Sequence, residues 1–229
     1  MEVHHKHGPI RNWREFAIEI GVIVTGIAIA LGGEQAIETI HHRNEVREVR
    51  ESLRKEMANN MGVMQDMIDK IPCSTERLDE IERWANSLQT AHLLHLVRPA
   101  DIPPYTIFPT ATWHAAPPDA LARLPLEERN SFALWYDGVN DAKETRKTVI
   151  DNWGDIRRLS RASRLSEEQR LKLFSDIDTI RNGFRYMNIV YKNFWTPLAK
   201  EYGVTVQKVN PPKELLPAKA AICQPLLAS

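Results

Sequence analysis

Histidine is the residue type in this chain that could most readily bind a metal ion. His92 and His95 lie three positions apart in a leucine-rich segment, which would place them one turn apart on a helix. A zinc site needs three or four converging ligands, and no cysteine pair or Glu-containing His-x-x-x-His motif accompanies these two. We expect packing or interface roles for both histidines, with metal binding as the alternative, and no cofactor.

Catalytic signatures are missing from the sequence. It contains neither a Gly-x-Ser-x-Gly nucleophile motif nor a glycine-rich phosphate loop. The 30 basic and 30 acidic residues give a net charge of +0 and are mixed along the chain, so no basic face for nucleic acid is expected. The sequence therefore predicts a protein that is not an enzyme and has no catalytic residues.

One acidic residue, Glu19, lies inside the most apolar run of the chain, FAIEIGVIVTGIAIALGG at residues 16–33. As a helix, 18 residues span about 27 Å, close to the thickness of a bilayer core. The run lacks the polar stripe of a soluble core helix, and its apolar pattern continues to Ile37, past a small-residue site where a signal peptide could be cleaved. We therefore expect a retained transmembrane helix, with a signal peptide and a soluble helix as the alternatives.

A carboxylate within a membrane span normally faces protein or water. Small residues in the same run would let another helix approach closely. The predicted membrane-helix contacts are Glu19, Gly21, Thr25, Gly26 and Ala30. The alternative for Glu19 is an interfacial side chain that reaches the lipid headgroups.

Basic residues precede the apolar run, whereas the first one after it is Arg43. The positive-inside rule then places the short N-terminus in the cytoplasm and the main domain in the periplasm of a bacterial inner membrane. We expect Trp13, Arg11 and Arg14 to anchor the helix at the interface. An oxidising compartment would permit a disulfide between Cys73 and Cys223, the alternative being two free thiols.

Helical spacing of apolar residues dominates the rest of the chain. It predicts one long helix over 12–71 that ends at Pro72, a second from the N-cap Ser74 to Leu96, and a third over 126–160. A capping box at Ser166–Gln169 opens a fourth that ends near Tyr202. A proline-rich connection over 98–118 holds one short helical turn around residues 112–114.

These elements predict an all-α fold. A transmembrane helix continues into a long stalk helix and an antiparallel bundle of about four helices. The expected organisation is a cytoplasmic segment over 1–15, the span over 16–33, the helical extracytoplasmic bundle over 34–203 and an extended, proline-containing tail over 204–229.

The run GPIRNWREFAIEIGVIVTGIAIALGGEQAIETI, with Leu53-Arg54-Lys55-Glu56 and Asn60 after it, resembles an uncharacterised family of bacterial single-span membrane proteins. Thr112-Trp113, leading into residues 126–136, is similar to that family's middle region. The resemblance covers about two thirds of the chain and implies a membrane-anchored helical domain. It implies no activity and no catalytic residues.

Two functions follow as hypotheses. The first is a membrane-anchored interaction or accessory subunit that binds a partner membrane protein, or a second copy of itself, through its span and helical domain. The second is a ligand-sensing bundle that signals through a partner's span. A filled core with an exposed aromatic face would favour the first, and an apolar cleft with a few convergent polar groups inside the bundle would favour the second.

Overall fold

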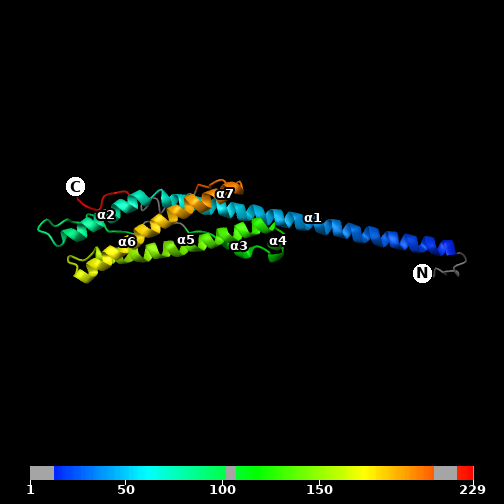
Figure 1. Ribbon diagram of the computed structural model, residues 1–229, viewed down its shortest axis with the longest axis horizontal. Helices are drawn as coiled ribbons and strands as arrows, with labels where there is room; N and C mark the ends of the chain where they lie inside the picture. Colours follow the sequence, from blue (N-terminus) through cyan, green and yellow to red (C-terminus); the bar gives the residue numbers. More distant parts are fainter. Residues whose placement is uncertain (1–12, 102–106, 209–220, 229) are drawn as a thin grey trace, which may run out of the picture. The chain divides into compact units, whose positions relative to one another are not determined.

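The structure, a computed structural model, describes residues 13–101, 107–208 and 221–228 of the chain, and helices dominate it (Figure 1). They are α1 (Trp13–Ile68), α2 (Ile71–Ser87), α3 (Ala111–Ala115), α4 (Pro118–Ala122), α5 (Leu126–Leu159), α6 (Glu167–Val190), the π-helix η1 (Tyr191–Trp195) and α7 (Thr196–Glu201). The described residues form no strand beyond an isolated antiparallel bridge between Leu96 and Leu227. The prediction of an all-α fold is confirmed.

The chain divides into two compact units, Met1–Glu48 and Val49–Ser229. Helix α1 begins in the first unit and ends in the second. The first unit contributes no buried side chain among its described residues, so all of the core belongs to the second unit.

The second unit is a helical bundle, as predicted. Helices α5 and α6 pack along each other, and α2 packs on α6 (Figure 1). Large apolar side chains at helical spacing fill the interior, which is the burial that stabilises a bundle. They include Leu53, Met57, Met61 and Met64 of α1, Leu78 and Ile81 of α2, Phe132, Trp135, Val139 and Trp153 of α5, and Leu173, Ile177 and Ile180 of α6.

The junction between α1 and α2 differs from the prediction at Ser74. Helix α1 ends at Ile68 and α2 begins at Ile71, so Pro72 opens the second helix. Proline suits the first turn of a helix because its missing N–H would have no intrahelical partner there. Ser74 is therefore a buried residue inside α2 rather than its N-cap, and its backbone N–H donates to Lys70 O over 2.9 Å.

Helix α2 ends at Ser87, nine residues before the predicted end at Leu96. The Ser87 hydroxyl donates to Trp84 O over 2.7 Å and accepts from the backbone N–H of Leu94 over 2.9 Å. The Thr90 hydroxyl lies 3.0 Å from Ser87 O and 3.2 Å from His92 O. These side-chain bonds offer the backbone an alternative to the helix, and the chain turns there instead.

The other boundaries follow the sequence closely. Helix α3 covers the expected turn around 112–114, although α4, opened by Pro118, was not predicted. The capping box forms as predicted: Ser166 Oγ accepts from the Gln169 N–H, and the Gln169 side chain accepts from the Ser166 N–H. Between α6 and α7 the helix widens into the π-helix η1, directly before Pro197. There the Thr196 N–H donates to Tyr191 O, five residues back. A wider turn accommodates a proline that cannot donate to the ladder.

Candidate functional site

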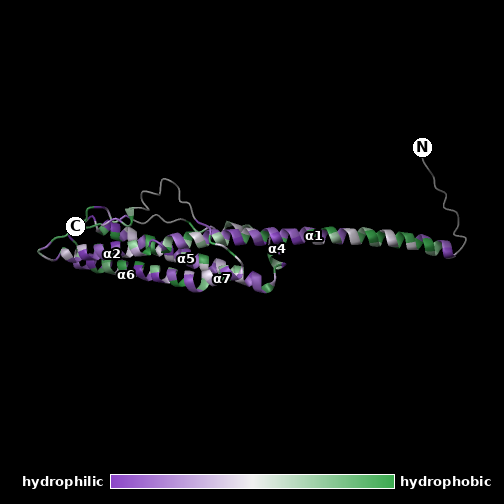
Figure 2. Cartoon of the chain, turned by 90° about the horizontal axis from the view of Figure 1, so that it is seen from above, coloured by the Kyte–Doolittle hydropathy of each residue, from purple (hydrophilic) through white to green (hydrophobic). Residues whose placement is uncertain are grey.

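The apolar run in the first unit lies on an uncovered helix. Every described residue from Trp13 to His41 is exposed, including Ile18 at 67% and Ile29 at 70%. Figure 2 shows the run as a series of apolar residues along the N-terminal part of α1. Within the described chain this is the one helix long and apolar enough to cross a membrane.

The predicted helix contacts fall on two faces of α1. At about 100° per residue, Glu19, Gly26 and Ala30 lie within roughly 20° of one direction, while Gly21 and Thr25 lie on the other side. The Thr25 hydroxyl donates to Gly21 O over 2.7 Å, so it is satisfied within its own helix. No atom lies within 4 Å of a Cβ built on Gly21 or Gly26, outside the helix's own backbone. The five predicted contact residues thus form two groups, and only Gly26 and Ala30 share the face of Glu19.

The predicted interfacial anchors are partly described. Trp13 begins α1 and is 77% exposed, and Arg14 is exposed beside it. Arg11 lies outside the described residues. An exposed indole and a guanidinium at the start of an apolar helix match the composition of a membrane–water interface.

A buried polar cluster lies in the second unit, between α1 and α5. The Tyr136 hydroxyl donates to Glu56 Oε1 over 2.7 Å, and the backbone N–H of Thr112 donates to Glu56 Oε2 over 3.0 Å. Burial raises the pKa of the Tyr136 hydroxyl well above its usual range, and the hydrogen bond to Glu56 and its negative charge raise it further. Trp113 stacks on the Tyr136 ring with centroids 4.9 Å apart.

The same cluster holds the described part of the proline-rich connection against the bundle. Asn60 Nδ2 donates to Pro109 O over 2.9 Å, and Lys143 Nζ donates to Thr110 Oγ1 over 2.8 Å. Phe108 is buried edge-on against Trp195, with centroids 5.7 Å apart. Two side chains of α1, one charged and one polar, therefore bind the main chain of residues 107–116.

An open groove runs beside this cluster. Its lining residues are polar or charged apart from Pro109; the others are Ser52, Lys55, Glu56, Asn59, Thr112 and Gln207. Both carboxylate oxygens of Glu56 already accept hydrogen bonds from Tyr136 and Thr112, so this carboxylate serves to position residues 107–116.

Periodicity missed Glu56 and Asn60 as site residues, although a signal was present. Both occupy the core face of α1, three and seven positions after Leu53, so polar residues stand where apolar ones were expected. Buried polar groups need hydrogen-bond partners, so polar residues on an apolar face mark a place where another segment docks.

The predicted placement of His92 and His95 on one turn of a helix is wrong. His92 and His95 lie beyond the end of α2, in an exposed irregular segment, so they do not share a helical turn. Across residues 13–101, 107–208 and 221–228, no group of three or more His, Cys, Asp or Glu side chains is placed to hold a metal ion.

The two cysteines form a disulfide. Cys73 in the first turn of α2 is bonded to Cys223, 150 residues later, with their Cα atoms 4.8 Å apart. The bond brings the end of the described chain onto α2.

Comparison with known proteins adds no assignment. No family model, curated protein or solved structure matches this chain. The function must therefore be inferred from the site itself.

Proposed function

We propose that this protein is a single-pass membrane subunit whose span and helical domain bind a partner protein or a second copy of the chain. The observation that carries the proposal is the uncovered helix over 16–33. Burial of a large aliphatic side chain is favourable by about 1.5–3 kcal/mol of transfer free energy, which each such residue loses while it stays in water. A run this long therefore needs lipid or protein around it.

Glu19 supports a protein contact within the membrane. A carboxylate in a span costs roughly 2.5–3.5 kcal/mol at the bilayer centre, and less near the interface. It shares a face with Gly26 and Ala30, which would let another helix approach the backbone closely. A partner helix could then supply a hydrogen-bond donor to the carboxylate.

The sidedness is also a proposal. Arg14 and the basic residues before it favour a cytoplasmic N-terminus, which would place the bundle in the periplasm of a bacterial inner membrane. The Cys73–Cys223 disulfide supports this location, because disulfides form in oxidising compartments.

Burial of the largest side chains supports interaction over ligand sensing: Trp135, Trp153 and Trp195 are fully buried in the bundle. The predicted aromatic face is not part of this support, because Tyr186 is the one exposed aromatic side chain among the described residues of the bundle. The groove beside Glu56 is open, and its lining residues are polar or charged apart from Pro109, unlike the apolar pockets that hold small organic ligands.

The test is fractionation followed by co-purification of the full chain from mild detergent. We expect the chain to sediment with membranes, to resist alkaline extraction and to elute with a stoichiometric partner or second copy. A chain that stays soluble without detergent, or is cleaved within the apolar run, contradicts the membrane anchor. An integral but solitary monomer contradicts the interaction role.

Sidedness is tested in spheroplasts, by labelling the reduced cysteines with a membrane-impermeant thiol reagent.

A further inference from the structure

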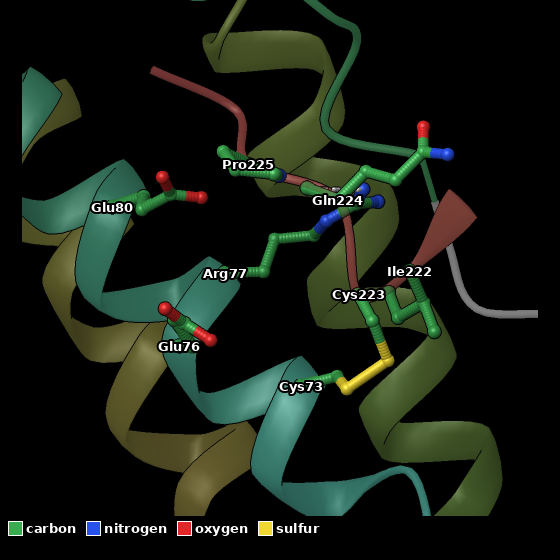
Figure 3. Close-up of a pocket in the computed structure, with 8 residues that line it drawn as sticks. All are labelled: Cys73, Glu76, Arg77, Glu80, Ile222, Cys223, Gln224 and Pro225. Carbon is green, nitrogen blue, oxygen red and sulfur yellow. Dashed lines mark hydrogen bonds between the residues drawn. A yellow bond between two sulfur atoms is a disulfide. The ribbon is translucent and has the colours of Figure 1, made fainter. Parts of the chain in front are cut away.

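The end of the described chain, residues 221–228, lies against α2 through contacts to its main chain (Figure 3). Arg77 Nη2 donates to Ala221 O over 2.7 Å and to Gln224 O over 3.5 Å. The Glu80 carboxylate accepts the backbone N–H groups of Leu226 over 2.8 Å and Leu227 over 3.4 Å. Two charges one helical turn apart thus bind this segment by its backbone.

Residues 221–228 also shield the side chains of Arg77 and Glu80 from water. Arg77 is 4% exposed and Glu80 is 7% exposed. Among the described residues, the hydrogen-bond partners of both side chains come from 221–228, apart from Asp101 O, which Arg77 Nη1 reaches over 3.3 Å. Burial lowers the pKa of the Arg77 guanidinium, and the nearby carboxylates of Asp101 and Glu80 offset part of that effect. Withdrawal of the segment would return both charges to water.

Non-covalent contacts also hold the segment. Besides its bonds to Arg77 and Glu80, it has two buried apolar side chains, Ile222 and Leu226. Two hydrogen bonds join it to the neighbouring segment: Val97 N–H donates to Leu226 O over 2.7 Å, and Arg98 Nη1 donates to Gln224 Oε1. Ordering of the segment opposes docking through lost conformational entropy, and water replaces each hydrogen bond on opening. The disulfide adds the covalent tie between the segment and α2.

The Cys73–Cys223 disulfide lies close to solvent. Cys223 is exposed and Cys73 is half-buried. Both line the same small hollow, together with the charged side chains of Arg77, Glu76 and Glu80. The disulfide thus lies at the surface of the bundle rather than in its core.

We propose that the Cys73–Cys223 disulfide is a redox-operated latch, which keeps residues 221–228 over Arg77 and Glu80 until a dithiol reduces it. One thiolate of the dithiol attacks Cys223 Sγ, and the Cys73 thiolate leaves and takes up a proton. The second thiolate of the dithiol then displaces Cys223 and closes the reductant's own disulfide. Two electrons and two protons pass to the protein, and the segment is released. The latch would operate whether or not the apolar helix lies in a membrane.

The test is hydrogen exchange on the full-length chain, with and without dithiothreitol. We expect reduction to speed exchange at the Leu226, Leu227 and Val97 amides by about tenfold or more, while amides in α5 and α6 keep their protection and reoxidation restores the slow rates. Unchanged rates at these three amides would overturn the latch. Loss of protection throughout α5 and α6 would also overturn it, since the disulfide would then stabilise the whole fold.

Two variants separate the covalent tie from the hydrogen bonds. Cys223→Ser, without reductant, should reproduce the pattern of the reduced chain. Glu80→Gln, with its disulfide intact, should keep Leu226 and Leu227 slower than in the reduced wild type. If the oxidised Glu80→Gln chain exchanged as fast as the reduced wild type, the hydrogen bonds and not the disulfide would hold the segment, contrary to the proposal.

Discussion

The Tyr136 hydroxyl donates a hydrogen bond to Glu56 Oε1 over 2.7 Å, joining two residues 80 positions apart. The bond links α1 to α5 where residues 107–116 dock, because the other Glu56 oxygen accepts from Thr112 N–H. A buried carboxylate is stable only while its partners are in place. The Tyr136–Glu56 pair is thus one of the contacts that join residues 107–116 to the bundle.

Removal of the hydroxyl should lower the stability of the bundle. We expect Tyr136→Phe to lower the free energy of unfolding by about 1.5–3 kcal/mol, the range for a hydrogen bond to a charged group. Denaturant unfolding measures the loss, and Tyr186→Phe on the exposed surface of α6 is the matched control. Equal effects of the two substitutions would show that the Glu56 contact contributes nothing special.

Stability should fall in alkali through the same residue. The folded state raises the pKa of Tyr136, so above about pH 10 the unfolded chain releases a proton that the folded chain keeps. Fewer bound protons in the unfolded state mean that unfolding becomes easier as pH rises. Between pH 9 and 11 we expect the wild type to lose roughly 1.4 kcal/mol more than Tyr136→Phe. Unfolding midpoints measured from pH 9 to 11 check this, and parallel curves would contradict it.

Two glycines should respond to alanine with opposite signs. A Cβ on Gly183 would lie 2.8 Å from Val149 Cγ2, between α6 and α5, whereas a Cβ on Gly154 would have no atom within 4 Å outside its own helix backbone. We expect Gly183→Ala to destabilise by about 1–2 kcal/mol net and Gly154→Ala to stabilise by about 0.5–1 kcal/mol through helix propensity. Thermal or urea unfolding gives both signs, and a stabilising Gly183→Ala would mean that the two helices move apart easily.

The two faces of the proposed span should differ in partner binding. Gly26→Leu with Ala30→Leu adds bulk on the Glu19 face, and we expect it to reduce recovery of the co-purified partner or copy about tenfold. Gly21→Leu with Thr25→Leu adds similar bulk on the other side and should leave recovery unchanged. If the second pair were the disruptive one, the contact would lie on the face away from Glu19.

Helix prediction succeeded where the signal is local. The long apolar spacing of α5, the capping box of α6 and the apolar run of α1 each rest on neighbours within a few turns. It failed at the end of α2, because the leucines of 93–96 continue the helical pattern while the hydroxyls of Ser87 and Thr90 bind the backbone and stop the helix. Pro72 likewise displaced the predicted cap at Ser74 by starting α2 earlier.

By itself, the sequence determined the helical class, most helix bounds and an apolar segment long enough to cross a membrane, because these depend on composition and short-range spacing. Only the tertiary structure decided that Cys73 meets Cys223, that Glu56 receives Tyr136 and Thr112, and that Arg77 and Glu80 bind residues 221–228. Each of those contacts joins residues more than fifty positions apart. Such pairs are selected by how the helices pack, and packing is a property of all the side chains together.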